Sequence, residues 1–216
     1  MLRLGIDTSG VGQALVLLDG RQLVGAADWE RSRDDPPVLR RLKGLLAQAG
    51  ARPEDLEAVA AARGPGSFTG LRVGLSLAAG IAYAGHLPIY LLDSMPLLAR
   101  RGLPAPARVA IRDAGHGEVY AWREGEGIRR LPVAELPAWL PATGSVMVEP
   151  ALKLGVWSPV HGTLEPPADQ RAPASRALAD GAIAAFLAQK PVRYDEVQAL
   201  YVQPAAAEER KRKAPG

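Results

Sequence analysis

The sequence predicts an α/β protein built from two related lobes. Its first half opens with three apolar strands separated by short turns, and then alternates strands with helices. Such alternation is typical of parallel strands whose two faces are both covered by helices. The second half repeats the order in a reduced form with many prolines. Because 48% of the 216 residues are hydrophobic and 23% are charged, the chain can bury a substantial core.

The first half has the expected element order βββαβαβα. Its strands are expected at residues 2–8, 12–19, 22–30, 56–62 and 88–92. Helices are expected at residues 37–49, 67–85 and 94–101, and Gly50 ends the first of them. An antiparallel meander followed by alternating strands and helices describes the ribonuclease-H-like half of the two-lobed, actin-like ATPase fold.

A proline-containing segment at residues 102–106 marks the expected boundary between two domains. They are an actin-like lobe of residues 1–103 with partner-facing helices, and a reduced lobe of residues 104–216 with a basic tail. The second lobe is expected to contain strands at residues 108–112, 118–123, 127–132 and 145–148, a helix at 174–188 and an extended segment at 200–203.

Residues 63–74 form the most informative motif, with four glycines within twelve residues where an expected strand leads into an expected helix. Glycine permits tight turns and the close approach of a ligand or another backbone. A helix that starts near Ser67 would present free amide groups, which favour an anion, so the loop could bind phosphate or a partner. The alternative is a tight strand-to-helix turn whose glycines serve packing only. The motif is neither a Walker A loop nor G-x-G-x-x-G.

The helix expected at residues 67–85 is apolar on nearly every side, and Arg72 is its only charged residue. A helix of this kind is expected to be buried on every side, in a core or between subunits. Gly70, Gly74 and Ala78 share one side of it, where another helix could approach closely. Its length is near that of a membrane span, but the interior glycines and Arg72 argue against one.

Charge and composition exclude some classes of function and leave others open. The chain lacks cysteine, which excludes disulfides and thiolate chemistry. Its net charge is +3, and residues 210–213 alone carry four positive charges, so the remainder is nearly neutral. This tail could contact RNA through counterion release, or be a solvated terminus without function. Asp7 interrupts the first apolar run, which argues against a signal peptide and for a cytoplasmic protein.

The first hairpin turn carries Asp7, Thr8 and Ser9, which could contact magnesium and phosphate if the fold retains nucleotide binding. The alternative is that these side chains close the turn through hydrogen bonds. Asp113 is the candidate for a second carboxylate, but no glycine-rich adenosine loop follows it. Glu118 and Tyr120 alternate along one strand and are expected to face the cleft or the sheet packing.

Several segments resemble the bacterial TsaB (YeaZ) family. They are residues 5–9 (Gly-Ile-Asp-Thr-Ser), 64–74 of the glycine-rich motif, and 113–114 with 118–120. The resemblance covers most of residues 2–120, and residues 200–202 also fit. It implies a cytoplasmic, non-catalytic scaffold required for threonylcarbamoyladenosine at position 37 of tRNA. Such a scaffold pairs with the catalytic paralogue TsaD, works with the ATPase TsaE, and forms a homodimer when alone.

The resemblance also implies a partner surface on the first two helices and the glycine-rich loop. The expected partner-binding residues are Val38, Leu42, Leu45, Gly64, Pro65, Gly66, Ser67, Phe68, Thr69, Gly70, Leu71, Arg72, Gly74 and Ala78. Catalytic relatives hold a metal with His-x-x-x-His, whereas His86, His116 and His161 are widely separated, so neither a catalytic residue nor a metal is expected. ATP with magnesium is expected only within the complex. The alternative function is an ATP-binding enzyme of the same fold that uses Asp7 and Thr8.

The sequence departs from the family pattern in two places. Gly115 stands where the family's Asp-Ala-Arg motif has arginine, which puts an anion contact there in doubt. Residues 34–37 (Asp-Asp-Pro-Pro) stand where a histidine-containing segment usually opens the first helix, which affects the expected start of the partner surface.

Overall fold

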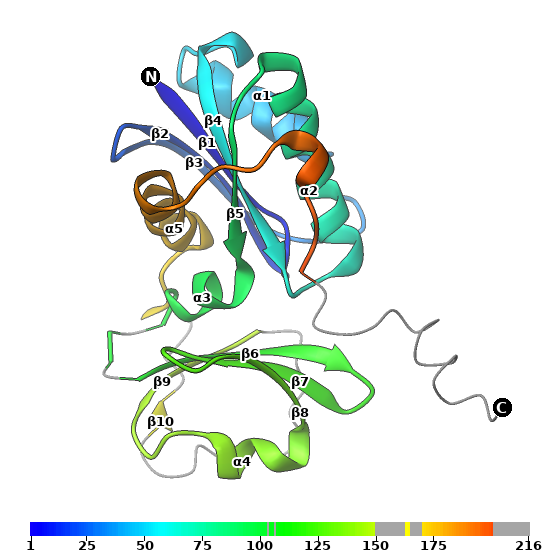
Figure 1. The fold of residues 1–216 in the computed structure, drawn as a ribbon, viewed down its shortest axis with the longest axis vertical. Helices are drawn as coiled ribbons and strands as arrows, with labels where there is room; N and C mark the ends of the chain where they lie inside the picture. Colours follow the sequence, from blue (N-terminus) through cyan, green and yellow to red (C-terminus); the bar gives the residue numbers. More distant parts are fainter. Residues whose placement is uncertain (103, 106, 150–162, 165–169, 201–216) are drawn as a thin grey trace, which may run out of the picture.

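The computed structural model describes residues 1–102, 104–105, 107–149, 163–164 and 170–200, which form two lobes, each built on a five-stranded sheet (Figure 1). The first sheet contains β1 (Leu2–Asp7), β2 (Gly12–Asp19), β3 (Gln22–Glu30), β4 (Leu56–Gly64) and β5 (Ile89–Asp93). The second contains β6 (Arg108–Gly115), β7 (Glu118–Arg123), β8 (Gly127–Pro132), β9 (Gly144–Val148) and β10 (Thr163–Leu164). The helices are α1 (Val38–Gln48), α2 (Phe68–Gly85), α3 (Ser94–Ala99), α4 (Leu136–Trp139) and α5 (Ala174–Ala188). Short 3-10 turns are η1 (Pro53–Asp55), η2 (Val133–Glu135) and η4 (Tyr194–Glu196).

The two sheets have the same connectivity. In the first, β1, β2 and β3 form an antiparallel meander, and β4 and β5 continue from β1 in parallel, giving the order β3-β2-β1-β4-β5. In the second, β6, β7 and β8 form the meander, and β9 and β10 continue from β6 in parallel. The structure therefore confirms the actin-like fold class and the reduced repeat.

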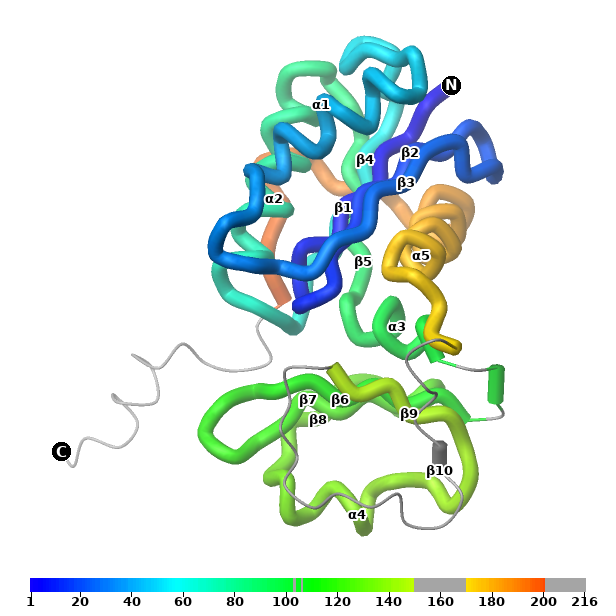
Figure 2. The backbone as a smooth tube through the Cα atoms, turned by 180° about the vertical axis from the view of Figure 1, so that it is seen from behind, coloured from blue at the N-terminus to red at the C-terminus, as the bar shows by residue number. Residues whose placement is uncertain are grey.

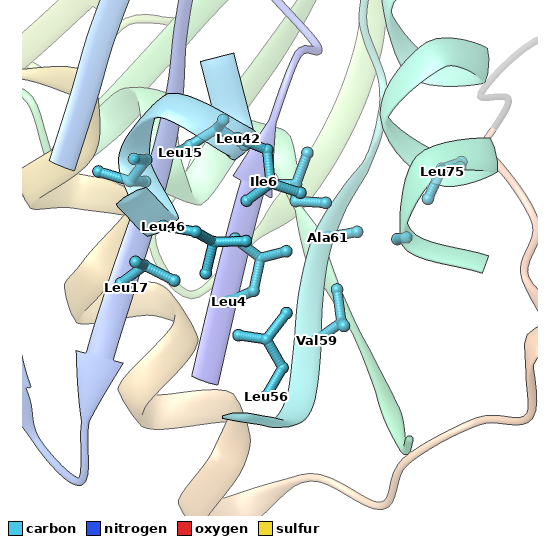
Figure 3. Close-up of a cluster of buried hydrophobic side chains, with 12 residues drawn as sticks. Leu4, Ile6, Leu15, Leu17, Leu42, Leu46, Leu56, Val59, Ala61 and Leu75 are labelled. Atoms are coloured by element: carbon cyan, nitrogen blue, oxygen red, sulfur yellow. The ribbon is translucent and has the colours of Figure 1, made fainter. Parts of the chain in front are cut away.

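Helices cover both faces of the first sheet. In Figures 1 and 2, α1 and α2 lie on one side of it and α5 lies on the other. Alternate residues of a strand point to opposite faces, so Leu4 and Ile6 of β1 both meet α1. Figure 3 shows them packed with Leu15, Leu42 and Leu46 in a cluster of fully buried side chains. On the opposite face, Leu178 of α5 is buried against β2.

The contact between the lobes runs through α3. Met95 and Leu98 of this short helix pack against Ala110 and Met147 of the second sheet, beside Tyr120. The far face of the second sheet is covered by Leu136 and Trp139 of α4. One helix thus holds the two sheets together on the side where the first turn and the glycine-rich loop lie.

Most expected elements are present. The bounds of β2, β3, β7, β8 and α5 agree with the expectation, whereas α1 is one residue shorter at each end and α2 starts one residue later. The chain enters the second sheet after residue 107, in agreement with a boundary near residue 103. Helix α5, however, packs against the first sheet. It therefore belongs to the first lobe, whereas the expected division into residues 1–103 and 104–216 assigned it to the second. Helix α4 was not expected. The segment expected at 200–203 lies outside the described residues except for Leu200, whose amide donates to the Arg63 carbonyl over 2.6 Å.

Among the described residues, no helix has both the length and the apolarity needed to cross a membrane. The basic tail, Trp157 and His161 lie outside the described residues.

Candidate partner surface and interlobe cleft

The glycine-rich loop is tied to the rest of the chain by its own backbone. The amide of Gly64 donates to Ser94 Oγ over 3.0 Å, and the amide of Ser67 donates to the Ser9 carbonyl over 2.7 Å. Ser67 caps α2, since its Oγ accepts a hydrogen bond from the Gly70 amide over 3.2 Å. Gly64 has φ of +112°, which a side chain rarely permits. These contacts favour the packing interpretation of the loop over a phosphate site.

The small residues of α2 face the chain's own first strand. A Cβ on Gly74 would overlap Thr8 Oγ1 and lie 3.5 Å from Ile6 Cγ2, and a Cβ on Gly70 would overlap the Thr8 carbonyl. Thr8 Oγ1 donates to the Gly70 carbonyl over 2.7 Å. The prediction that another helix could approach Gly70, Gly74 and Ala78 is therefore wrong, because β1 and the adjoining Thr8 already occupy that space.

The structure divides the expected partner-binding residues into two groups. One group is buried inside the first lobe, where it cannot touch a partner: Leu42, Leu45, Gly64, Pro65, Gly70, Leu71, Gly74 and Ala78. The other reaches the surface fully or in part: Val38, Gly66, Ser67, Phe68, Thr69 and Arg72. One side of α2 is open in this chain, so the expected burial of α2 on every side stays a prediction for a complex between subunits.

The open side of α2 and the adjacent part of α1 form an apolar surface. We name it the α1–α2 face and define it by Leu39, Val73, Leu77, Gly80 and Ile81. Leu39 and Val73 are 49% and 44% exposed. Two shallow hollows of about 370 and 380 Å³ lie on this face, lined mainly by apolar side chains, and Leu39 and Leu77 contribute to both. This exposed apolar surface makes the α1–α2 face the candidate partner surface of the chain.

Two further exposed aromatic side chains flank the α1–α2 face. Phe68 is 54% exposed, and the guanidinium of Arg72 stacks over its ring, with Arg72 Cζ 3.7 Å from the ring centre. Tyr83 is 60% exposed and packs edge-on against Tyr194. Sequence reasoning named Phe68 and Arg72 of α2 but missed Val73 and Tyr83, because a helix that is apolar all round does not reveal which side faces solvent. It also missed Leu39, which lies on α1.

The turn that carries Asp7, Thr8 and Ser9 is closed by its own hydrogen bonds. The Ser9 amide donates to Asp7 Oδ1 over 2.9 Å, and the Thr8 hydroxyl donates to the Gly70 carbonyl. All three residues are buried. This geometry agrees with the interpretation in which these side chains stabilise the turn.

The cleft between the lobes is filled by a buried ion pair that sequence reasoning missed. Arg112 Nε lies 3.1 Å from Glu149 Oε2. Arg112 Nη1 donates to the Pro65 carbonyl over 2.6 Å and to Ser9 Oγ over 3.2 Å. Glu149 Oε1 accepts from the Val11 amide over 3.1 Å. The available signal is a charged residue, Arg112, directly after three apolar residues of β6, Val109, Ala110 and Ile111.

Little space remains beside this pair. The cavity lined by Asp7, Arg101, Arg112 and Glu149 has a volume of about 10 Å³, close to that of a single water site. Burial lowers the pKa of the Arg101 guanidinium, although the carboxylates of Asp28, Asp7 and Glu149 act in the opposite direction. A cavity of this volume does not accommodate a nucleotide.

Asp113, the candidate second carboxylate, does not lie in the cleft. It is exposed, and its Oδ1 accepts a hydrogen bond from the Gly115 amide over 2.8 Å. Glu149 is the carboxylate that the second lobe contributes. Gly115 has φ of +77° and begins a turn in which His116 and Gly117 also have positive φ. A side chain is strained in this conformation, which gives a backbone reason for the missing arginine.

Glu118 and Tyr120 lie on the second sheet rather than in the cleft. Glu118 forms an ion pair with Arg130 of β8, and Tyr120 packs beside α3. Burial raises the pKa of the Tyr120 hydroxyl, and Glu118 adds to this effect while Arg130 opposes it. Within the described part of the chain, no group of three or more His, Cys, Asp or Glu side chains could hold a metal ion.

Two matching five-stranded sheets, with a turn and a glycine-rich loop meeting at the cleft between them, define a protein of the actin-like ATPase fold. A solved structure of YeaZ from Pseudomonas aeruginosa superposes with a TM-score of 0.69 at 20% identity, over 93% of this chain and 100% of that one.

Sequence comparisons show which known proteins the chain resembles. A model described as TsaD, tRNA N6-adenosine threonylcarbamoyltransferase, matches residues 38–137. The chain is 30% identical over 122 residues to the tRNA threonylcarbamoyladenosine biosynthesis protein TsaB of Bacillus subtilis, covering 56% of this chain and 53% of that protein. It is 35% identical over 140 residues to the tRNA N6-adenosine threonylcarbamoyltransferase of Thermus thermophilus, covering 54% and 42%. The chain is similar to proteins of the TsaB (YeaZ) family, and it spans about half the length of the curated relatives it matches.

Proposed function

We propose that this chain is a non-catalytic subunit in the biosynthesis of threonylcarbamoyladenosine at position 37 of tRNA. It acts in the cytoplasm by pairing with a TsaD-like catalytic paralogue, and a TsaE-like ATPase joins the complex. The proposal rests on the similarity to this family and on one structural observation, the exposed apolar α1–α2 face.

The α1–α2 face fits a partner of the same lineage. The chain matches a family model for the transferase over a segment that includes α1 and α2, so a TsaD-like partner is expected to carry equivalent helices. Two related surfaces can then meet in a nearly two-fold arrangement, each burying the other's apolar side chains. The same argument allows a homodimer through this face when the paralogue is absent, so the homodimer and the heterodimer would compete.

The closed cleft supports the non-catalytic role. The Arg112–Glu149 pair and the hydrogen-bonded turn at Asp7 occupy the space in which a nucleotide would have to lie. The alternative, an ATP-binding enzyme that uses Asp7 and Thr8, requires this cleft to open. Calorimetry of the isolated chain with Mg-ATP is expected to show no binding. Micromolar binding that Asp7→Ala abolishes would replace our proposal with the alternative.

A single charged substitution tests the partner surface. Val73→Glu places a carboxylate on the α1–α2 face, where it would have to lose its water in the complex. We expect the affinity for the TsaD-like paralogue to fall at least tenfold, which is about 1.4 kcal/mol. Leu187→Glu is the matched control, because Leu187 is 61% exposed on α5, on the opposite side of the sheet.

Affinities from calorimetry or surface binding, with circular dichroism as a check on folding, decide the outcome. Val73→Glu binding as tightly as the unmodified chain would contradict the assignment of the α1–α2 face. An equal loss in Leu187→Glu would show that the substitution acts through something other than this face.

A further inference from the structure

We propose that Arg112 and Glu149 act as a latch that holds the glycine-rich loop against the β1–β2 turn and so positions the start of α2. Its consequence for partner binding rests on the function proposed above. The latch itself, as a contact that joins the two lobes, does not depend on that function.

The pair belongs to the second lobe, and its hydrogen bonds cross to the first. Arg112 donates to the Pro65 carbonyl over 2.6 Å and to Ser9 Oγ over 3.2 Å, while Glu149 accepts from the Val11 amide over 3.1 Å. Arg112 and Glu149 are only 4% and 8% exposed. One buried guanidinium therefore contacts both the loop and the turn, and its carboxylate partner contacts the turn again.

The backbone is shaped to admit the guanidinium. A Cβ on Gly66 would lie 2.7 Å from Arg112 Nη1, and a Cβ on Gly10 would lie 2.7 Å from Arg112 Nη2. Both distances are shorter than real Cβ contacts. Glycine at these two positions, one in the loop and one in the turn, leaves space for Arg112 together with the Ser9 carbonyl at Gly66 and the Glu149 carboxylate at Gly10.

The loop leads directly into the partner surface. Pro65 and Gly66 immediately precede Ser67, whose amide donates to the Ser9 carbonyl and whose hydroxyl caps α2. Phe68 then begins the exposed side of the helix. A shift of the loop away from the turn would therefore move the first residues of α2, and with them one end of the α1–α2 face.

Breaking the pair is expected to open this region locally. Arg112→Met keeps the length of the side chain but removes its charge and its donors, which leaves Glu149 as a buried, unpaired carboxylate. We expect the lobes to separate at the turn, because this lets more water solvate that carboxylate. Arg130→Met is the matched control, since the ion pair of Arg130 with Glu118 stays within the second lobe.

Amide hydrogen exchange provides the direct readout on the full chain. In Arg112→Met we expect exchange at Val11 and Ser67 to accelerate at least tenfold, with amides at the centre of β7 unchanged. The affinity for the TsaD-like paralogue is expected to fall at least fivefold, whereas Arg130→Met changes neither quantity.

Each outcome decides part of the proposal. Unchanged exchange at Val11 and Ser67 would overturn the latch, and faster exchange with full affinity would overturn its link to the α1–α2 face. If Arg112→Met does not fold, the same exchange measurement on Glu149→Gln, which removes the charge but keeps an acceptor, decides instead. If the unmodified chain does not bind the paralogue, the proposed function fails, while the exchange data still test the latch.

Discussion

Gly74 and Gly80 lie in the same helix, yet their replacement by alanine should change stability in opposite directions. Gly80 is exposed, and a Cβ there would meet nothing within 4 Å. Gly74 is buried, and a Cβ there would overlap the hydroxyl of Thr8. The comparison tests whether the small-residue side of α2 faces β1, as the structure has it, or is open to a partner.

The expected magnitudes follow from these surroundings. Alanine in place of glycine in a helix stabilises it by about 1 kcal/mol, which is the whole effect expected for Gly80→Ala. Gly74→Ala gains the same helix propensity, but forcing its methyl group against Thr8 costs about 1–3 kcal/mol in overpacking. Displacing Thr8 also breaks its buried hydrogen bond to Gly70, at a cost of about 1–3 kcal/mol. The two variants should therefore differ by at least about 2 kcal/mol in the free energy of unfolding.

Urea unfolding followed by circular dichroism measures both free energies under one set of conditions. Gly80→Ala should raise the midpoint relative to the unmodified chain, and Gly74→Ala should lower it. Equal stabilisation by the two substitutions would refute the packing of α2 on β1 described above.

Two further predictions concern the second lobe. Because the pKa of the Tyr120 hydroxyl is raised in the folded chain, the unfolded chain releases this proton first, and stability should fall as the pH rises above about 10. Tyr120→Phe should remove that part of the fall in urea unfolding at alkaline pH, and an unchanged pH profile would contradict it. Gly115→Arg should cost about 1–2 kcal/mol through its positive φ alone, since nothing lies within 4 Å of its Cβ position. Thermal unfolding checks this, and unaltered stability would remove the backbone explanation for Gly115.

Local signals in the sequence were sufficient to predict most of the strands and helices. The turn at Asp19 and Gly20 separates two apolar runs, and β2 and β3 have the expected bounds. The order of elements then led to the fold, because a meander followed by alternating strands and helices fits few topologies. These features depend on neighbours in the sequence, which a pattern records directly.

The orientation of α2 could not be predicted in the same way. A helix with apolar residues on nearly every side has no periodicity to show which side meets the core. Gly70 and Gly74 suggested a close approach, and the structure bears this out, but the approaching element is β1 of the same chain. The exposed side of α2, with Val73, and the neighbouring Leu39 of α1 can be identified only once the positions of both helices on the sheet are known.

The contents of the interlobe cleft depend on contacts that are distant in the sequence. Arg112 is 103 residues from Ser9 and 47 residues from Pro65, and it contacts both. No local pattern predicts such a pairing, because it arises when α3 packs the second sheet against the first. Asp113, the sequence-based candidate, is an exposed residue of β6 directly after Arg112, the arginine that fills the cleft.

The central claim is that this chain works by pairing through the α1–α2 face. The most direct measurement is light scattering after size exclusion, on the chain alone and mixed with the TsaD-like paralogue of the same organism. We predict that the mixture elutes as a one-to-one heterodimer, and that any homodimer of this chain disappears as the heterodimer forms. A mixture in which both proteins keep the masses they have alone would contradict the account.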